Sequence, residues 1–329
     1  MGNEVLTENN TMQSIGDRLS VKRANLFYLI ELILSVVIGA IPGITNVVPA
    51  TIVPLFSYIP VVVLAIIFCK KEGVSFSNSF GFKGAKPLSF LLVFIICIAF
   101  QPTIYTVSTI ANRIYPNIVS QASGSASVVN DSMFINFIGI AIIPPFFEEF
   151  VIRGGLLGSY VKTGRLRAAA ILTGLIFGLS HMNGAQFFHT TVMGVLLAVI
   201  FEITDSIWPG IMFHFINNGQ TLLVPLLYGK IDIDKFKKVV YPYERGFKSV
   251  TDTLITIGFV IAGLVITVLC LKYVAKCEGT EDRLWKDVET EAENKKLITP
   301  ALIIALVFLI LMTLFMTIAL IIALKKTGA

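Results

Sequence analysis

The stretch that decides the fold is PPFFEEFVIR, residues 144–153. It places two carboxylates and one guanidinium inside an apolar run that extends from Met133 to Leu157. Such a run can cross a bilayer, which takes about 20 apolar residues. Each charge near the bilayer centre costs about 2.5–3.5 kcal/mol on insertion scales, so three could cost roughly 8–10 kcal/mol without compensation. We therefore expect these charges to be paired, hydrated or functional.

The spacing of the charges separates the two glutamates. Glu149 and Arg153 are four residues apart, so they share a helix face, with the glutamate on the favoured N-terminal side. Glu148 is rotated by about 100° from Glu149 around the same helix. The pattern predicts that Glu149 and Arg153 form a structural pair and that Glu148 remains free for chemistry.

The composition of the whole chain is that of a membrane protein. Its 329 residues are 55% hydrophobic and only 14% charged, with a mean hydropathy of +0.81. The net charge of +5 is small and distributed among loops, so nucleic-acid binding is not expected. The four cysteines show no Cys-x-x-Cys spacing, which favours free thiols over a disulfide framework or a cysteine metal site.

Apolar segments recur along the chain and predict an all-α, polytopic transmembrane bundle with about eight or nine spans. We divide the chain into a polar tail (1–23), a transmembrane core (24–274), a charged linker (275–296) and an additional C-terminal helix (297–329). The approximate limits of the apolar segments are 24–42, 47–69, 88–110, 133–157, 166–182, 185–203, 206–228, 251–274 and 298–324.

The distribution of lysine and arginine predicts the orientation. Basic residues gather after the second, fourth and eighth apolar segments, which places these loops and the N-terminus in the cytoplasm. The loop 229–250 is also basic and goes against this arrangement. With its Ile-, Lys- and Asn-rich composition, the chain is expected to be an integral protein of a bacterial cell membrane.

Four polar residues stand out on three separate apolar segments. Glu148 lies on the fourth, His181 on the fifth, and both His214 and Asn218 on the seventh. His181 shares a helix face with Phe177, and His214 shares one with Asn218, since each pair is four residues apart. Taken singly, each has an ordinary explanation as an interhelical hydrogen-bonding group. Together they indicate a functional site that faces the bundle interior.

These residue types suit the hydrolysis of an amide bond. A partly desolvated glutamate can take a proton from water, and a neutral histidine beside it can hold the second hydrogen. A second histidine with an asparagine amide offers donors to a developing oxyanion. No serine or cysteine lies in a recognised nucleophile context, which favours a water nucleophile. Zinc held by Glu148, His181 and His214 is the competing use, but no His-Glu-x-x-His pattern occurs, so no cofactor is expected.

These residues belong to three short motifs, which are Glu148-Glu149-x-x-x-Arg153, Phe177-x-x-x-His181 and His214-x-x-x-Asn218. In this order they resemble the motifs of the CAAX-protease and bacteriocin-processing family, also called Abi proteins. The resemblance covers about residues 130–225. It implies a glutamate-type intramembrane endopeptidase, related to the type II CAAX prenyl endopeptidases, whose partners are the lipid bilayer and a membrane-associated peptide or protein.

The resemblance also implies a role for each motif residue. Glu148 with His181 would activate water, and His214 with Asn218 would stabilise the oxyanion. The supporting positions are Glu149, Arg153 and Phe177. The alternatives are a non-catalytic bacteriocin-immunity or scaffold protein of the same fold, a zinc-dependent form of the protease, and a proton-coupled transporter.

Two further expectations concern helix geometry. Counting residues puts Glu148 near the inner face and His181 near the outer end of its segment, so the two meet only if a boundary shifts or a helix is broken. Pro144-Pro145 is the expected place of a break. The pattern Gly174-x-x-x-Gly178 predicts close helix packing.

Overall fold

The computed structural model describes residues 17–43, 48, 52–114, 133–227, 247–290 and 296–327. Every regular element in these ranges is a helix, so the predicted all-α fold is confirmed. The elements are α2 (Val21–Gly39), α4 (Leu55–Glu72), α5 (Phe76–Phe80), α6 (Pro87–Ile114), α9 (Met133–Asn136), the π-helical η1 (Phe137–Ile142), α10 (Ile143–Glu148), the π-helical η2 (Glu149–Leu157), α11 (Gly158–Val161), α12 (Leu166–Ser180), α13 (Gly184–Thr204), α14 (Trp208–Leu227), α16 (Val250–Glu278) and α17 (Pro300–Thr327).

Five of the described helices are long and apolar enough to cross a membrane. Their outer faces carry exposed aliphatic and aromatic side chains, such as Leu264 on α16 and Phe315 on α17, as expected for contact with lipid. These features mark an integral membrane protein, while the total of eight or nine spans stays a prediction. The five helices are Pro87–Ile114, Phe134–Val161, Gly184–Thr204, Val250–Glu278 and Pro300–Ala319.

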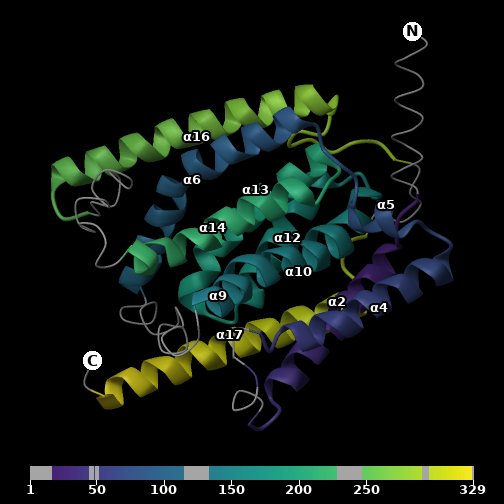
Figure 1. Cartoon of the computed structure of the whole chain (residues 1–329), viewed down its shortest axis with the longest axis horizontal. Coiled ribbons are helices and arrows are strands. Elements are labelled where there is room, and N and C mark those ends of the chain that lie inside the picture. The colour runs from purple at the N-terminus through teal and green to yellow at the C-terminus, as the bar shows by residue number, and fades with distance from the viewer. Residues whose placement is uncertain are drawn as a thin grey trace.

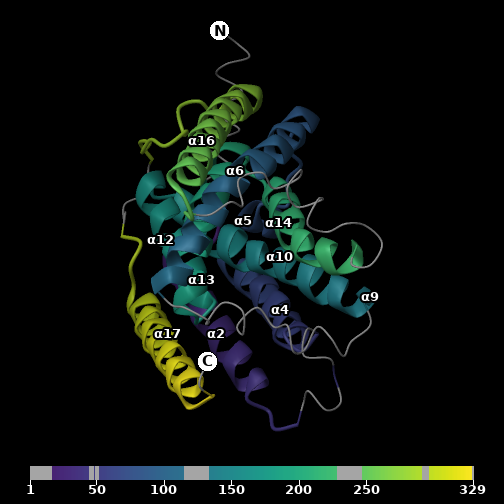
Figure 2. The same ribbon diagram turned by 90° about the vertical axis from the view of Figure 1, so that its left-hand side faces the viewer.

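The helices form one bundle with α13 near its middle (Figure 1). Figures 1 and 2 both show α16 running beside α6 on one side of the bundle and α17 beside α2 on the other. Helix α12 packs along α13, and the two helices between them supply much of the buried core. Helices α2, α5, α12 and α13 contact η2, and all residues of η2, which holds the second half of PPFFEEFVIR, are buried.

Most observed helix boundaries differ from the predicted segment limits by up to about four residues, and the start of the second segment differs by more. The second apolar segment was expected to begin at residue 47, but α4 begins at Leu55, with Pro54 at its N-cap position. Helix α16 continues to Glu278, beyond the predicted end of its apolar segment at residue 274. Most of the loop 229–250, the tail 1–16 and the linker residues 291–295 lie outside the described residues. The predicted orientation and division into segments stay predictions.

A cluster of ion pairs lies at the C-terminal end of α13. Asp205, directly after α13, forms ion pairs with the fully buried Arg18 and with Lys83 Nζ, which lies 2.9 Å from Asp205 Oδ2. Burial raises the pKa of Asp205, but the Arg18 guanidinium and the Lys83 ammonium outweigh it and hold this pKa below the ordinary value of 3.8. The ionised carboxylate therefore stabilises the fold.

Acidification is expected to remove this contribution. Because the pKa of Asp205 is lower in the folded protein, its stabilisation is complete above the ordinary value and is lost as pH falls through the folded value. Asp205→Asn keeps a residue that tolerates the left-handed backbone (φ 53°) but removes the charge. We expect it to lower the free energy of unfolding near neutral pH by about 1.5–3 kcal/mol. Unfolding in detergent between about pH 6 and pH 3 should show a smaller loss of stability in the variant. An equal loss in both proteins would contradict this role.

Helices α12 and α13 approach closely at glycines, as the Gly174-x-x-x-Gly178 pattern predicted. A Cβ atom on Gly174 would lie 2.5 Å from Val195 Cγ2, and one on Gly178 would lie 2.8 Å from the carbonyl oxygen of Phe187. Gly194 on α13 faces Gly174 across the same contact. The absent side chains let the two backbones meet.

Gly178→Ala is therefore expected to separate α12 from α13 and to lower the free energy of unfolding by about 1–3 kcal/mol. Gly258→Ala on α16 is the matched control, because a Cβ atom there meets nothing within 4 Å. The control should be neutral or slightly stabilising, since alanine has the higher helix propensity. Thermal unfolding of the two purified variants compares them directly. Equal stability of the two would refute the close-contact interpretation.

Candidate active site

The prolines of the motif segment change the helix locally without interrupting it. Pro144 and Pro145 lie in α10, between the π-helical turns η1 and η2, and the helix runs continuously from Phe134 to Val161. Proline lacks a backbone N–H, so carbonyl groups one turn before it lose their donor. π-Helical turns of this kind are frequent at functional sites. The expected break is thus replaced by two locally widened segments, one of which begins at Glu149.

Glu149 and Arg153 are in contact in the protein interior. Arg153 Nη1 lies 3.1 Å from Glu149 Oε1, and both side chains are at most 1% exposed. Arg153 also donates from Nη2 to the carbonyl oxygen of Gly194 at 3.0 Å, and its guanidinium carbon lies 4.6 Å from the centre of the Phe177 ring. The pair thereby ties the motif segment to α12 and α13.

His214 on α14 lies between the two glutamates. Its Nδ1 is 3.2 Å from Glu149 Oε1, and its Nε2 is 3.7 Å from Glu148 Oε2. The Phe177 ring packs against the imidazole edge at a centroid distance of 5.5 Å. Since a carboxylate only accepts, Nδ1 carries the hydrogen in the shorter contact. Glu149 therefore orients His214 so that Nε2 faces Glu148.

His181 caps the C-terminal end of α12 and is oriented by its own helix. Its Nδ1 lies 2.9 Å from the carbonyl oxygen of Phe177, which can only accept a hydrogen bond. In the neutral imidazole this leaves Nε2 without a hydrogen and able to accept one. The Phe177 ring meets the His181 ring edge to face at 5.0 Å and limits its rotation.

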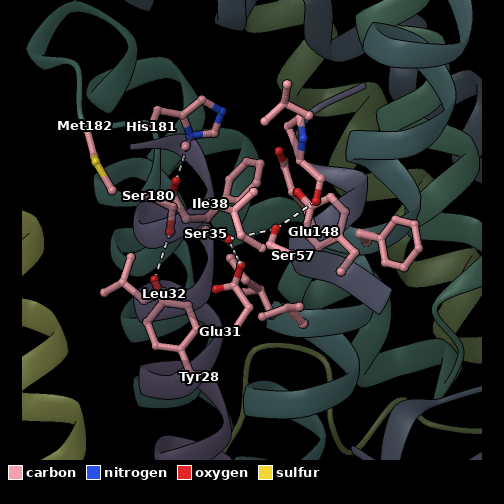
Figure 3. A pocket seen from close by; sticks show the side chains of 18 residues that line it. Tyr28, Glu31, Leu32, Ser35, Ile38, Ser57, Glu148, Ser180, His181 and Met182 are labelled. Carbon is pink, nitrogen blue, oxygen red and sulfur yellow. Dashed lines mark hydrogen bonds between the residues drawn. The ribbon is translucent and has the colours of Figure 1, made fainter. Parts of the chain in front are cut away.

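Glu148 and His181 both line a cavity of about 270 Å³. The two side chains therefore reach the same space, although counting residues had put them near opposite faces of the membrane. Figure 3 shows both side chains among the residues that line the cavity. Glu148 is 28% exposed, whereas its neighbour Glu149 is 0% exposed. The two glutamates therefore differ as their spacing predicted: Glu149 is held by partners in the core, and Glu148 reaches the cavity.

Asn218 lies one turn after His214 on α14, and neither of these two side chains is among those that line the cavity. Asn218 Nδ2 donates to the carbonyl oxygen of Ile140 at 3.1 Å. Ile140 precedes Pro144 by four residues, so this carbonyl would otherwise lack its helical donor. In this structure Asn218 thus supplies the hydrogen bond that the proline cannot.

Sequence reasoning missed the wall of the cavity formed by α2 and α4. This wall carries one carboxylate, Glu31, and a group of hydroxyls, which are those of Tyr28, Ser35, Ser57 and Tyr58. Glu31 was detectable, because it is an ionisable residue inside the apolar segment 24–42, and the insertion cost applied to Glu148 applies equally to it. The hydroxyl groups carry no comparable signal.

The zinc alternative would use Glu148, His181 and His214 as ligands. Within the described part of the chain, no three or more histidine, cysteine, aspartate or glutamate side chains are grouped so that they could hold a metal ion. The expectation of a cofactor-free site and the zinc alternative both stay predictions.

Comparison with known proteins covers the segment that holds all three motifs. Residues 130–220 match the family model described as type II CAAX prenyl endopeptidase Rce1-like. A Bacillus subtilis (strain 168) protein named "Putative membrane peptidase YdiL" is 26% identical over 86 residues, which are 26% of this chain and 35% of that protein. No solved structure matches the chain. The matched segment confirms the resemblance to the CAAX-protease and bacteriocin-processing family, while the alignment spans about a third of the relative's length.

Proposed function

We propose that the protein is an intramembrane endopeptidase of the glutamate type. It would hydrolyse a peptide bond in a membrane-associated peptide or protein, using Glu148 and His181 with water as the nucleophile. The observation that carries this proposal is the cavity shared by Glu148 and His181, with His214 directly behind Glu148. All these residues lie in the segment that matches the peptidase family.

The proposed reaction uses the two groups that face the cavity. Water bound between Glu148 and His181 would give one proton to the Glu148 carboxylate and direct its other hydrogen to His181 Nε2. The oxygen of the water attacks the scissile carbonyl carbon and forms a tetrahedral intermediate. Glu148 then returns the proton to the amide nitrogen as the carbon–nitrogen bond breaks, so the carboxylate is regenerated.

We assign stabilisation of the oxyanion to His214 and Asn218. In each side chain, one N–H group is already used in a hydrogen bond within the protein. Because His214 Nδ1 donates to Glu149, the ring can donate through Nε2 only in its doubly protonated form. Asn218 Nδ2 has two hydrogens, of which one is taken by the Ile140 carbonyl oxygen. The second hydrogen is the one that the proposal assigns to the oxyanion.

The test compares host cells that carry wild-type protein with cells that carry Glu148→Gln at matched membrane abundance. Peptide termini from the membrane and the medium are then identified by mass spectrometry. Termini that disappear only in the variant are expected, and they would also identify the substrate. Identical sets of termini would overturn the peptidase proposal in favour of a non-catalytic immunity or scaffold protein.

A further inference from the structure

The catalytic proposal leaves one carboxylate of the cavity unused. Glu31 lies on α2 and lines the same cavity as Glu148 and His181 (Figure 3). It is half-buried and belongs to none of the three motifs. It therefore places a second carboxylate at the cavity from a helix that carries none of the motif residues.

The surroundings of Glu31 satisfy only part of its carboxylate. Ser35 Oγ donates to Glu31 Oε1 at 2.8 Å, one helical turn further along α2. In the part of the chain that the structure describes, no hydrogen bond to Oε2 and no ion pair with an arginine or lysine is found. Arg153, the cation of the motif segment, is engaged by Glu149 and Gly194. Glu31 therefore offers an acceptor at the cavity without a cation beside it.

A carboxylate in this position favours a particular kind of ligand. An ionised group at membrane depth is costly unless it is paired or hydrated, and a charge-assisted hydrogen bond from a cation is about twice as strong as a neutral one. Apolar side chains lie among the hydroxyls of the lining, with Leu32 on α2 itself, Val53 just before α4 and Val151 on the motif segment. Such a lining suits the methylene stem of a lysine or arginine whose charged end reaches a carboxylate.

We infer that Glu31 is a specificity-determining residue that binds a lysine or arginine side chain of the substrate close to the peptide bond that is cleaved. This inference rests on the proposed function, because it places the substrate between Glu31 and Glu148. The Ser35 hydroxyl holds the Glu31 carboxylate toward the cavity. The substrate class is accordingly a membrane-associated peptide with a basic residue near its cleavage site.

Binding tests the inference without requiring turnover. Full-length protein with Glu148→Gln is purified in detergent and titrated with two fluorescent leucine-rich nonapeptides that differ only in a central lysine or glutamine. We expect the lysine peptide to bind about tenfold more tightly, as one added charge-assisted hydrogen bond allows. Adding Glu31→Gln should abolish the difference, and Glu31→Lys should favour a third peptide with a central glutamate. Equal binding of lysine and glutamine peptides by the protein that retains Glu31 would overturn the inference.

A matched control and a second readout separate this inference from the proposed function. Glu281→Gln makes the same chemical change at an exposed linker position and should leave the lysine preference intact. In cells, the termini that depend on Glu148 should carry lysine or arginine within a few residues of the cut and should decrease in Glu31→Gln. Cut sites without basic residues would refute selection by Glu31 while the peptidase stands. Absence of any Glu148-dependent terminus would refute the peptidase, and the binding ratios would still decide the role of Glu31.

Discussion

Glu148→Gln is expected to slow peptide cleavage by roughly 10²–10⁴-fold, the usual contribution of a general base. Glutamine preserves the size of the side chain but cannot take a proton from water. Since Glu148 is 28% exposed at the cavity and its contact with His214 Nε2 is 3.7 Å, the fold should hardly change. Product formation by purified protein in proteoliposomes measures the effect, with a substrate taken from the cellular termini.

Glu149→Gln provides the comparison for this result. Glu149 is fully buried and accepts from both Arg153 and His214, so its replacement should first lower stability and the amount of folded protein. Unfolding temperature and cleavage rate are measured on the same two preparations. Full cleavage by Glu148→Gln together with loss of cleavage in a folded Glu149→Gln protein would reverse the roles that we assign to the two glutamates.

Arg153→Met is expected to lower the free energy of unfolding by about 3–5 kcal/mol, because it leaves the buried Glu149 carboxylate without its cation. The same change removes the donor to the Gly194 carbonyl oxygen and the guanidinium that covers the Phe177 ring. Thermal unfolding in detergent should show a large fall in midpoint and a lower yield of folded protein. The methionine side chain is similar in length, so the loss of stability reflects mainly the lost charge and hydrogen bonds.

Arg167→Met is the control for the loss of an arginine. Arg167 pairs with Asp287 at 3.2 Å, but the two side chains are 54% and 44% exposed, so the change should cost at most about 1 kcal/mol. The double variant Glu149→Leu with Arg153→Met should recover part of the stability lost in Arg153→Met, because no unpaired charge remains. Similar stability of Arg153→Met and Arg167→Met would show that the buried Glu149–Arg153 pair contributes no more to the free energy of unfolding than an exposed pair does.

The sequence was sufficient to predict those structural features that depend only on residues close together along the chain. Runs of about 20 mainly apolar residues predict membrane helices because that length crosses the hydrocarbon core of a bilayer. The i,i+4 spacing of Glu149 and Arg153 predicts contact because residues four apart share a helix face. The difference between Glu148 and Glu149 follows from the same periodicity, and their unequal exposure agrees with it.

Contacts between distant segments could not be derived in this way. No local pattern indicates that Asn218 donates to the carbonyl oxygen left free by Pro144, since the two positions meet only through the packing of α14 against the motif segment. Residue counting also failed to bring Glu148 to the depth of His181, because it treats each segment as a straight α-helix and ignores the π-helical turns around the prolines.

By itself, the sequence determined the all-α membrane fold, the three motifs and the separation of the two glutamates, because these depend on composition and helical periodicity. Only the tertiary structure decided that Glu148 and His181 share a cavity, that His214 lies between both glutamates, and that Glu31 on α2 completes the wall. The physical reason is that a cavity is enclosed by helices far apart in the chain. Which side chains face it is set by how those helices pack, tilt and rotate against one another.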